Sequence, residues 1–195
     1  MNNSVTVLFS AEEIQTRVHE LGKMISRDYV GKDPLFVGVL KGCFIFMADL
    51  LRSVTIPCEM DFMVVSSYSG AKSTGIVKIN KDLSKDISNR HVIIVEDILD
   101  TGLTLSYLTR VLQARGAASV KVVTLLEKEV DHAIILDYCG FKCRADAFVI
   151  GFGLDYNERY RNLPYIGIFN PKTQEEVPEG TANDSSANVE RHILL

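Results

Sequence analysis

The sequence lacks several features that define whole classes of protein. Its 195 residues include no tryptophan and only five prolines. No apolar run approaches the roughly 18–20 residues that a helix needs to span a bilayer. The first ten residues also lack the basic and long apolar regions of a secretory signal. These absences argue against a membrane protein or a secreted protein, and we expect a cytoplasmic globular protein.

Cysteine, histidine and excess positive charge are also scarce. The four cysteines form no CxxC pair, and the four histidines show no HExxH spacing. This pattern predicts free thiols in a reducing compartment and argues against a zinc site. The formal net charge is −4, so the chain has no basic footprint for nucleic acid. An anionic substrate would therefore need locally placed cations or a metal ion.

What remains is an ordinary apolar content in a chain long enough for one sizeable core. Hydrophobic residues make up 47% of the sequence, which suits a single soluble domain. From position 171 onward the chain is rich in Glu, Asn and Ser and poor in apolar residues. We therefore predict a domain over residues 1–170 and a flexible C-terminal tail over residues 171–195.

Short apolar runs alternate with helical patterns along the predicted domain. Ser10 and Glu13 form a capping box before a helix with one apolar stripe. Further helices are expected over 44–51 and around 105–112, the latter ending at Gly116. Strands are expected at 35–40, 60–67, 76–79, 91–95, 120–126 and 147–150, with a weaker one at 165–169. This order predicts an α/β fold with a mostly parallel sheet covered on both faces, and ligands bound beyond the carboxyl ends of its strands.

The most informative segment is residues 92–104, VIIVEDILDTGLT. Glu96 and Asp97 follow an apolar strand, where two carboxylates are costly unless they face a cation or hydroxyl donors. The run from Asp100 to Thr104 then opens a helix, where Gly102 permits a positive φ and free N–H groups form an anion site. An Asp-Thr-Gly turn alone is often only a helix cap. Strand, acid pair and turn together predict a phosphate site flanked by acids.

These thirteen residues resemble the 5-phosphoribosyl-1-pyrophosphate motif of the type I phosphoribosyltransferases. Further segments occur in the order seen in the hypoxanthine-guanine branch, and residues 155–167 look like its bacterial members. These segments are Leu40-Lys41-Gly42, Ser67-Tyr68, Lys128, Phe148-Val149 and residues 154–161. The resemblance covers about residues 5–170. It implies a mostly parallel central sheet flanked by helices, with a small hood and a mobile hairpin lid over about residues 66–80.

The resemblance also implies a reaction and roles for single residues. The reaction is Mg²⁺-dependent transfer of phosphoribose to hypoxanthine or guanine, giving IMP or GMP and pyrophosphate. Asp100 would be the general acid/base at purine N7. The ribose phosphate would be bound by Glu96, Asp97, Asp100, Thr101, Gly102, Leu103 and Thr104. Pyrophosphate would be bound by Lys41, Gly42, Ser67, Tyr68 and Arg161.

Two further sets of residues follow from the same resemblance. The purine would be bound by Lys128, Phe148, Val149 and Asp155. Magnesium would be held by Glu96, Asp97 and Asp155. The resemblance also implies a cis peptide bond before Lys41 and assembly into a homodimer or homotetramer. The chain departs from its relatives at Cys43, where many have glycine, and at residues 142–146, where the family often has proline.

Three alternatives compete with this interpretation. A phosphoribosyltransferase for adenine, orotate or uracil is disfavoured by Lys128 and by the block from Phe148 to Arg161. A regulator that keeps the fold but binds nucleic acid is disfavoured by the acidic net charge. A dinucleotide-dependent oxidoreductase is disfavoured because Gly151-Phe-Gly153 is followed by Tyr156 where GxGxxG needs glycine.

Overall fold

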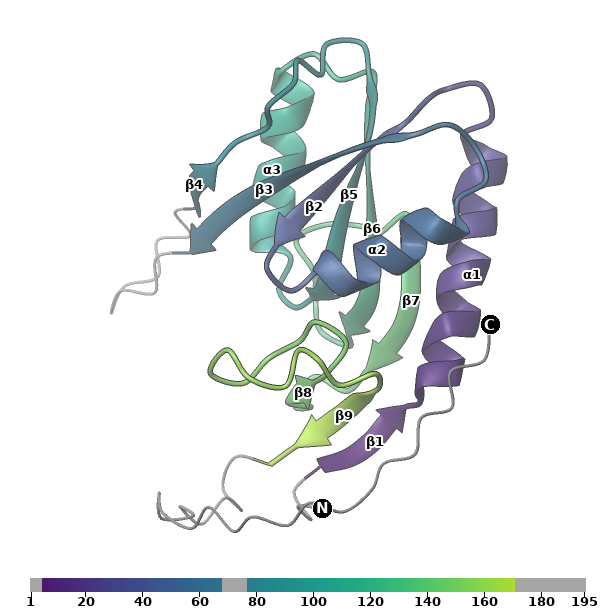
Figure 1. Ribbon diagram of the computed structural model, residues 1–195. Coiled ribbons are helices and arrows are strands. Elements are labelled where there is room, and N and C mark those ends of the chain that lie inside the picture. The colour runs from purple at the N-terminus through teal and green to yellow at the C-terminus, as the bar shows by residue number, and fades with distance from the viewer. Residues whose placement is uncertain (1–4, 68–76, 171–195) are drawn as a thin grey trace, which may run out of the picture.

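The computed structural model describes residues 5–67 and 77–170, which form two β-sheets and three helices (Figure 1). The larger sheet has six strands in the order β4-β3-β2-β5-β6-β7, and the smaller has three in the order β1-β9-β8. Within these ranges no helix is long and apolar enough to cross a membrane. Tyr68, the turn of the predicted lid and the predicted tail lie outside the described residues.

The larger sheet confirms the predicted α/β architecture. Its strands are β2 (Leu35–Leu40), β3 (Glu59–Ser67), β4 (Val77–Lys81), β5 (His91–Leu99), β6 (Ser119–Lys128) and β7 (Tyr138–Cys143). All neighbours are parallel except β4, which pairs antiparallel with β3 at one edge. The inner strands are buried and apolar almost throughout, as expected where helices cover both faces.

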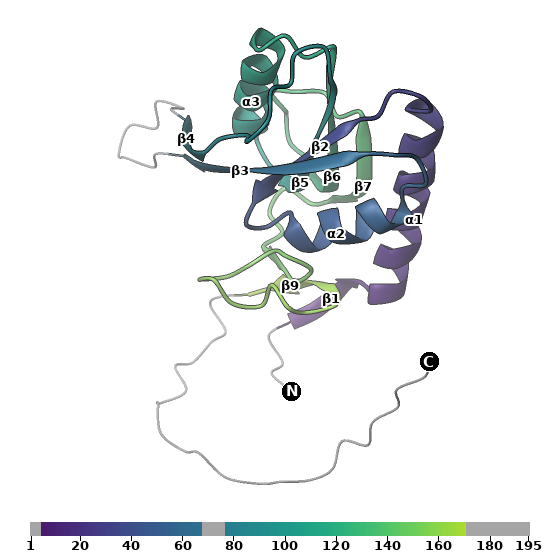
Figure 2. The same ribbon diagram turned by 45° about the horizontal axis from the view of Figure 1, so that its top comes forward.

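Alternate residues of these strands pack against different helices. Phe36 and Ile93 belong to a core with α1 (Ala11–Asp28) and α2 (Phe44–Ser53). Val37 and Ile94 belong to a second core with α3 (Leu103–Ala114). The division follows from the two-residue period of a strand. Figures 1 and 2 show α3 on one side of the sheet and α1 and α2 on the other.

The helix boundaries follow the sequence signals. The Ser10 hydroxyl accepts a hydrogen bond from the Glu13 N–H, and the Glu13 carboxylate accepts one from the Ser10 N–H, so the predicted capping box is present. Gly116 has φ +81° two residues beyond the last residue of α3, in keeping with its predicted place at that helix end.

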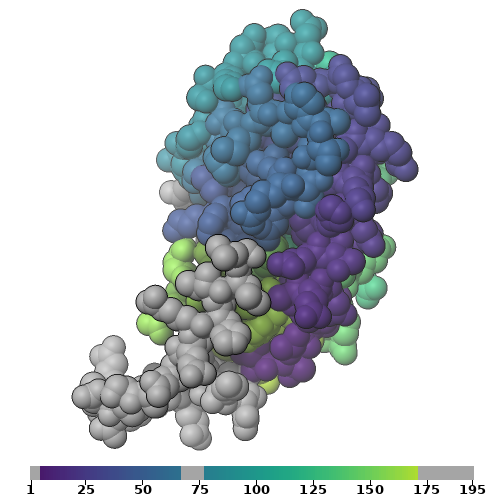
Figure 3. All heavy atoms as spheres, turned by 45° about the vertical axis from the view of Figure 1, so that its right-hand side comes forward, coloured from purple at the N-terminus to yellow at the C-terminus, as the bar shows by residue number. Residues whose placement is uncertain are grey.

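The smaller sheet differs from the prediction. It joins β1 (Val5–Phe9), β8 (Val149–Ile150) and β9 (Ile166–Phe169) in antiparallel pairs. The strands expected at 147–150 and 165–169 therefore belong to this separate hood and not to the parallel sheet. In the space-filling view of Figure 3, the yellow-green hood lies against the purple N-terminal region and beneath the blue surface of α2 and β3.

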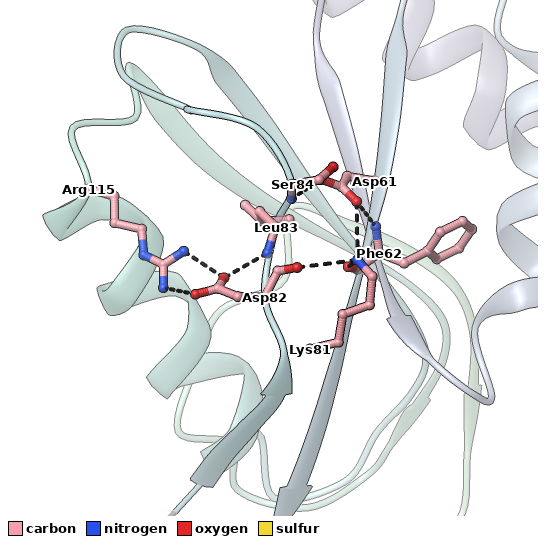
Figure 4. Close-up of polar contacts among 7 residues, drawn as sticks. All are labelled: Asp61, Phe62, Lys81, Asp82, Leu83, Ser84 and Arg115. Atoms are coloured by element: carbon pink, nitrogen blue, oxygen red, sulfur yellow. Dashed lines mark hydrogen bonds and ion pairs between the residues drawn. The ribbon is translucent and has the colours of Figure 1, made fainter.

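A buried carboxylate fixes the stem of the β3–β4 hairpin (Figure 4). Asp61 is 8% exposed and accepts hydrogen bonds from the Phe62 N–H (2.7 Å), the Ser84 N–H (2.7 Å) and the Ser84 hydroxyl (2.8 Å). The Lys81 ammonium lies 3.5 Å from the same carboxylate. Burial alone would raise the pKa of Asp61, but these donors outweigh it and hold the pKa below its ordinary value.

The segment after β4 is tied to α3 by a second carboxylate. Asp82 receives two hydrogen bonds of 2.7 Å from the Arg115 guanidinium at the carboxyl end of α3. Both side chains are partly exposed, so this contact orients the segment more than it stabilises the fold. Together the two carboxylates anchor the described part of the hairpin to the sheet and to α3.

Candidate active site

The candidate site lies where the loops after β2 and β5 meet the loop of the hood. A Cβ atom added to Gly42 would lie 1.8 Å from Asp97 Oδ2, and one added to Gly153 would lie 2.1 Å from the Gly42 carbonyl oxygen. Gly153, with φ +102°, therefore requires glycine, whereas a side chain at Gly42 would displace the Asp97 carboxylate. The Leu40–Lys41 peptide bond is cis, which confirms the expectation for the bond before Lys41.

The turn between β5 and α3 encloses a small recess. Its lining comprises Glu96 and residues 98–105. Gly102 has φ +76° and is the N-cap residue of α3, so the first N–H groups of the helix open toward this turn. The sequence predicted a phosphate site at this place, where the structure has a recess at the amino end of α3.

Glu96 and Asp97 lie within β5 and not beyond its end, because the strand continues to Leu99 and not only to Val95 as predicted. Their side chains occupy different places, as strand alternation requires. Glu96 lines the recess between β5 and α3, whereas Asp97 lies against Gly42. The two acids, called the floor acids below, therefore lie beside each other in β5, one at the recess and one at Gly42.

The electrostatic state of these two acids is unusual. Burial, followed by the charge of Asp97, raises the pKa of Glu96 well above its ordinary value. One of its oxygens, Oε2, is buried and has no hydrogen-bond partner in the described structure. Burial also raises the pKa of Asp97 to about 6, although the Ile98 N–H and the Arg161 charge oppose the rise. Carboxylates left in this state are ready to bind a cation or hydroxyl donors.

Asp100 and Lys128 meet at the other side of the phosphate loop. The Lys128 ammonium lies 3.4 Å from Asp100 Oδ2, and the Asp100 side chain is 59% exposed. Lys128 is the last residue of β6, so the parallel sheet brings the two together although they are 28 positions apart in the chain. The structure thus joins the predicted acid/base to the predicted purine ligand.

Cations gather around the hood loop, which runs from Gly151 to Arg161. Arg161 lies 2.7 Å from Asp155 Oδ1 and donates a 2.7 Å hydrogen bond to the Gly153 carbonyl. Glu158 lies 3.1 Å from the Lys41 ammonium and 3.4 Å from Arg161. Lys41 and Arg161, both predicted to bind pyrophosphate, therefore lie on either side of one carboxylate. Glu158 was not singled out from the sequence, because a lone acid in NERYR carries no signal.

Aromatic rings cluster in the hood. Phe148 is 42% exposed, and its ring meets Tyr156 edge to face at 5.7 Å between centroids. Phe169 packs against both rings, and its N–H donates to the Phe148 carbonyl. Val149 is buried in β8. Phe148 is thus fixed by neighbouring rings while part of its surface remains free to stack on a planar ligand.

Two predicted groups of residues are only partly described. Ser67 ends β3, and Tyr68 lies outside the described residues. Over the described ranges, no three His, Cys, Asp or Glu side chains are close enough to hold a metal ion by themselves. Magnesium usually takes one or two carboxylates and completes its shell with water and substrate oxygens, so the unpaired Glu96 and the adjacent Asp97 suit it chemically.

The comparisons with known proteins agree with this geometry. Residues 4–157 match the model of the phosphoribosyl transferase domain. The hypoxanthine-guanine phosphoribosyltransferase of Bacillus subtilis is 51% identical over 87% of this chain and 95% of its own length. A crystal structure of a hypoxanthine phosphoribosyltransferase from Staphylococcus aureus has a TM-score of 0.84 and 46% identity, covering 89% of this chain and 96% of that one.

Some relatives are much longer. The bifunctional protein TilS/HprT of Listeria innocua is 51% identical over 90% of this chain, but the match spans only 28% of that protein. The chain therefore corresponds to one part of those relatives and to nearly the whole of the Bacillus protein.

The mostly parallel sheet, the recess in the turn after β5 and the separate hood are those of a type I phosphoribosyltransferase domain. The chain belongs to the phosphoribosyltransferase family, and within it to the hypoxanthine-guanine phosphoribosyltransferases.

Proposed function

We propose that the chain transfers the 5-phosphoribosyl group of 5-phosphoribosyl-1-pyrophosphate to N9 of hypoxanthine or guanine. The products are IMP or GMP and pyrophosphate, which makes this a purine salvage reaction. The observation that carries the proposal is the recess at the amino end of α3: Glu96 and Asp100 belong to its lining, Asp97 follows Glu96 in β5, and Lys128 lies 3.4 Å from Asp100. The 51% sequence identity to the Bacillus subtilis enzyme, over 95% of that enzyme's length, supports the choice of substrates.

The 5′-phosphate would lie in the recess at the amino end of α3. N–H groups of the turn and the first helical residues donate to its oxygens, and the helix dipole favours its negative charge. The Thr101 and Thr104 hydroxyls add donors at the same place. The ribose hydroxyls would then lie over Glu96 and Asp97, whose carboxylate oxygens can accept their hydrogen bonds.

Pyrophosphate would lie between Lys41 and Arg161. In the structure described here the Glu158 carboxylate bridges these two cations, which indicates that they can hold an anion between them. As the bond from C1′ to the pyrophosphate oxygen breaks, that oxygen keeps the electron pair. Lys41 and Arg161 then stabilise the leaving charge.

The purine would stack on Phe148 with its 6-oxo group toward Lys128, which donates a hydrogen bond there and selects against a 6-amino group. Purine N9 forms the new bond to C1′, and Asp100 accepts the proton released at N7. The contact of 3.4 Å between Lys128 and Asp100 supports this placement, because neighbouring atoms of one bicyclic base would be reached by neighbouring side chains.

Magnesium would be held by Glu96, Asp97 and Asp155 together with substrate oxygens, and it would supply charge neutralisation for the diphosphate. The orphaned Glu96 oxygen and the raised pKa values of the floor acids support this assignment. Because the pKa of Asp97 is about 6, its affinity for a cation should fall as the pH drops through that value.

A turnover assay tests the proposal. The protein is mixed with 5-phosphoribosyl-1-pyrophosphate and, separately, with hypoxanthine, guanine, xanthine or adenine, with magnesium and with a chelator. We expect nucleotide from hypoxanthine or guanine, none from adenine, and loss of product with the chelator. Absence of product from every 6-oxopurine would refute the function, and turnover in the presence of chelator would refute the magnesium assignment.

We extend the proposal to the assembly and location expected from the family resemblance, namely a homodimer or homotetramer in the cytoplasm. Light scattering on the purified protein measures the molar mass of the assembly directly. A mass equal to one chain would refute it.

A further inference from the structure

The loop after β6 touches the phosphate loop through three successive residues. The His132 ring nitrogen Nδ1 lies 2.7 Å from the carbonyl oxygen of Asp100. The next residue, Ala133, donates its N–H to the carbonyl oxygen of Thr101 at 3.0 Å. A methyl group of Ile134 lies 3.0 Å from where a Cβ atom would stand on Gly102. Residues 132, 133 and 134 therefore contact residues 100, 101 and 102 in that order.

These contacts determine where the phosphate loop points its N–H groups. Within a trans peptide unit the C=O and the following N–H point in opposite directions. Leu40–Lys41 is the single cis peptide bond within the described ranges. The Asp100–Thr101 and Thr101–Gly102 peptide units are therefore trans. Holding the Asp100 carbonyl toward His132 therefore aims the Thr101 N–H away from it. Holding the Thr101 carbonyl toward Ala133 does the same for the Gly102 N–H.

Residues 132–134 contact the turn from outside the lining of the recess. Residues 98–105 line the recess, whereas residues 132–134 do not. The Asp100 and Thr101 carbonyl oxygens accept hydrogen bonds from these residues and are therefore turned toward the loop after β6, which leaves the two N–H groups on the recess side. A phosphate needs this arrangement, because carbonyl oxygens would repel it and N–H groups bind it.

His132 is itself held in place. A carbonyl oxygen only accepts hydrogen bonds, so Nδ1 carries the proton in this contact. On the other side of the ring, Nε2 lies 3.4 Å from Glu127 Oε1 in β6. The Lys142 ammonium of β7 lies 3.6 Å from the other oxygen of Glu127. The His132 side chain is only 13% exposed, so the ring sits between the sheet and the phosphate loop with little freedom to turn.

We propose that His132 is a positioning residue for the phosphate: it fixes the Asp100–Thr101 peptide so that the N–H of Thr101 points into the recess. The inference rests on the proposed function, in which the recess binds the 5′-phosphate. His132 acts through the backbone and does not touch the purine or the ribose. Its loss should therefore weaken binding of the phosphate group selectively.

Affinities for IMP and for inosine, measured by isothermal titration calorimetry, separate the phosphate from the rest of the nucleotide. His132→Ala should lower the affinity for IMP about tenfold, the effect of one hydrogen bond to a charged ligand, and leave the affinity for inosine unchanged. In turnover, the KM for 5-phosphoribosyl-1-pyrophosphate should rise by a similar factor, with the KM for the purine unaffected.

Two isosteric variants test the geometry. Asparagine places an amide N–H where Nδ1 stands, so His132→Asn should recover most of the affinity for IMP. Glutamine places its N–H near Nε2, on the Glu127 side, so His132→Gln should behave like His132→Ala. His19→Ala, an exposed histidine on α1, is the matched control and should bind IMP like the unchanged protein.

Three results would overturn the inference. One is unchanged IMP affinity in His132→Ala, and the second is an equal loss of IMP and inosine affinity, which would indicate general disruption. The third is equal recovery by asparagine and glutamine, which would show that the position of the donor is irrelevant. If the unchanged protein bound neither IMP nor inosine, the proposed function would be refuted, and the inference that depends on it would be refuted too.

Discussion

Two strands of the same sheet, β3 and β5 on either side of β2, carry acidic side chains in opposite electrostatic states. Asp61 of β3 is buried and receives hydrogen bonds from two N–H groups and a hydroxyl, so its pKa lies below the ordinary value (Figure 4). Glu96 of β5 has one buried oxygen without a partner, and its pKa is raised well above the ordinary value. Asp97 beside it has a pKa of about 6.

The difference separates a structural acid from acids reserved for a ligand. Asp61 gains its partners from the chain itself, so its charge stabilises the fold. Glu96 and Asp97 are desolvated without full compensation, which costs stability until a cation or hydroxyl donors arrive. We infer that the floor acids are retained for binding and that Asp61 is retained for the hairpin stem.

The largest effect is expected on kcat, from a substitution of Asp100, an acid that lies in the candidate site but is not buried. Asp100→Asn removes the proton acceptor, and we expect kcat to fall by about 10²–10⁴-fold. The free energy of unfolding should change little, because the Asp100 side chain is 59% exposed. Steady-state kinetics and urea unfolding measure the two quantities. A variant with unimpaired kcat would remove Asp100 from its proposed role.

The reverse pattern is expected for Asp61→Asn. The amide cannot satisfy all the donors that face the carboxylate, so we expect a loss of about 1–3 kcal/mol in the free energy of unfolding. Residual activity at a temperature where the variant is folded should be close to that of the unchanged protein. Asp146→Asn is the control, because that carboxylate is 71% exposed and pairs with Arg144 at the surface. Equal losses in the two variants would contradict a structural role specific to Asp61.

The pH dependence should differ in sign between the two strands. The raised pKa of Asp97 contributes stability below its unfolded value, and this contribution is lost as the pH rises through about 6. The lowered pKa of Asp61 contributes stability above the unfolded value, and this contribution is lost as the pH falls through the folded value. Asp97→Asn should therefore gain stability over the unchanged protein, by about 1–3 kcal/mol, as the pH rises from about 4 to 8.

The loss in free energy of unfolding caused by Asp61→Asn should instead become smaller as the pH falls. Urea unfolding of both variants and the unchanged protein across this range tests the signs. Parallel stability curves for all three proteins would show that neither acid changes its pKa on folding.

The smallest expected effect concerns the second carboxylate of the stem. Arg115→Gln removes a pair with Asp82 in which both side chains are partly exposed, and we expect a loss of about 0–1 kcal/mol. The loss should diminish in high salt, because exposed charges are screened. Urea unfolding at low and high salt measures it. A loss as large as that of Asp61→Asn would mean that the exposed pair, and not the buried acid, holds the stem.

Much of the fold was readable from the sequence because its signals are local. The capping box at Ser10, the apolar run over residues 35–40 and Gly116 after α3 each carry a one-segment signal, and each was predicted correctly. β1 and β7 were missed because they are partly exposed and short, and β7 contains glycine. The hood was implied by the family resemblance, but its strands were placed in the wrong sheet because pairing partners are distant in the chain.

The candidate site was predictable to a similar degree. The prediction from residues 92–104 falls on the turn where the structure has its recess, and Lys128 lies beside Asp100, while the binding roles of these residues stay predictions. Glu158 and His132 could not be found in this way. Each acts through contacts with residues far away in the sequence, Lys41 for Glu158 and the Asp100 carbonyl for His132. No spacing rule marks such contacts in a single sequence.

The most direct test of the contrast between the strands is the free energy of unfolding of Glu96→Gln without ligand at pH about 8, where the raised pKa of Glu96 makes its charge most costly. We predict that this variant is at least as stable as the unchanged protein, whereas Asp61→Asn measured beside it is clearly less stable. A loss in Glu96→Gln equal to that in Asp61→Asn would show that Glu96 also stabilises the fold, and it would contradict the claim that the floor acids are kept unsatisfied for a ligand.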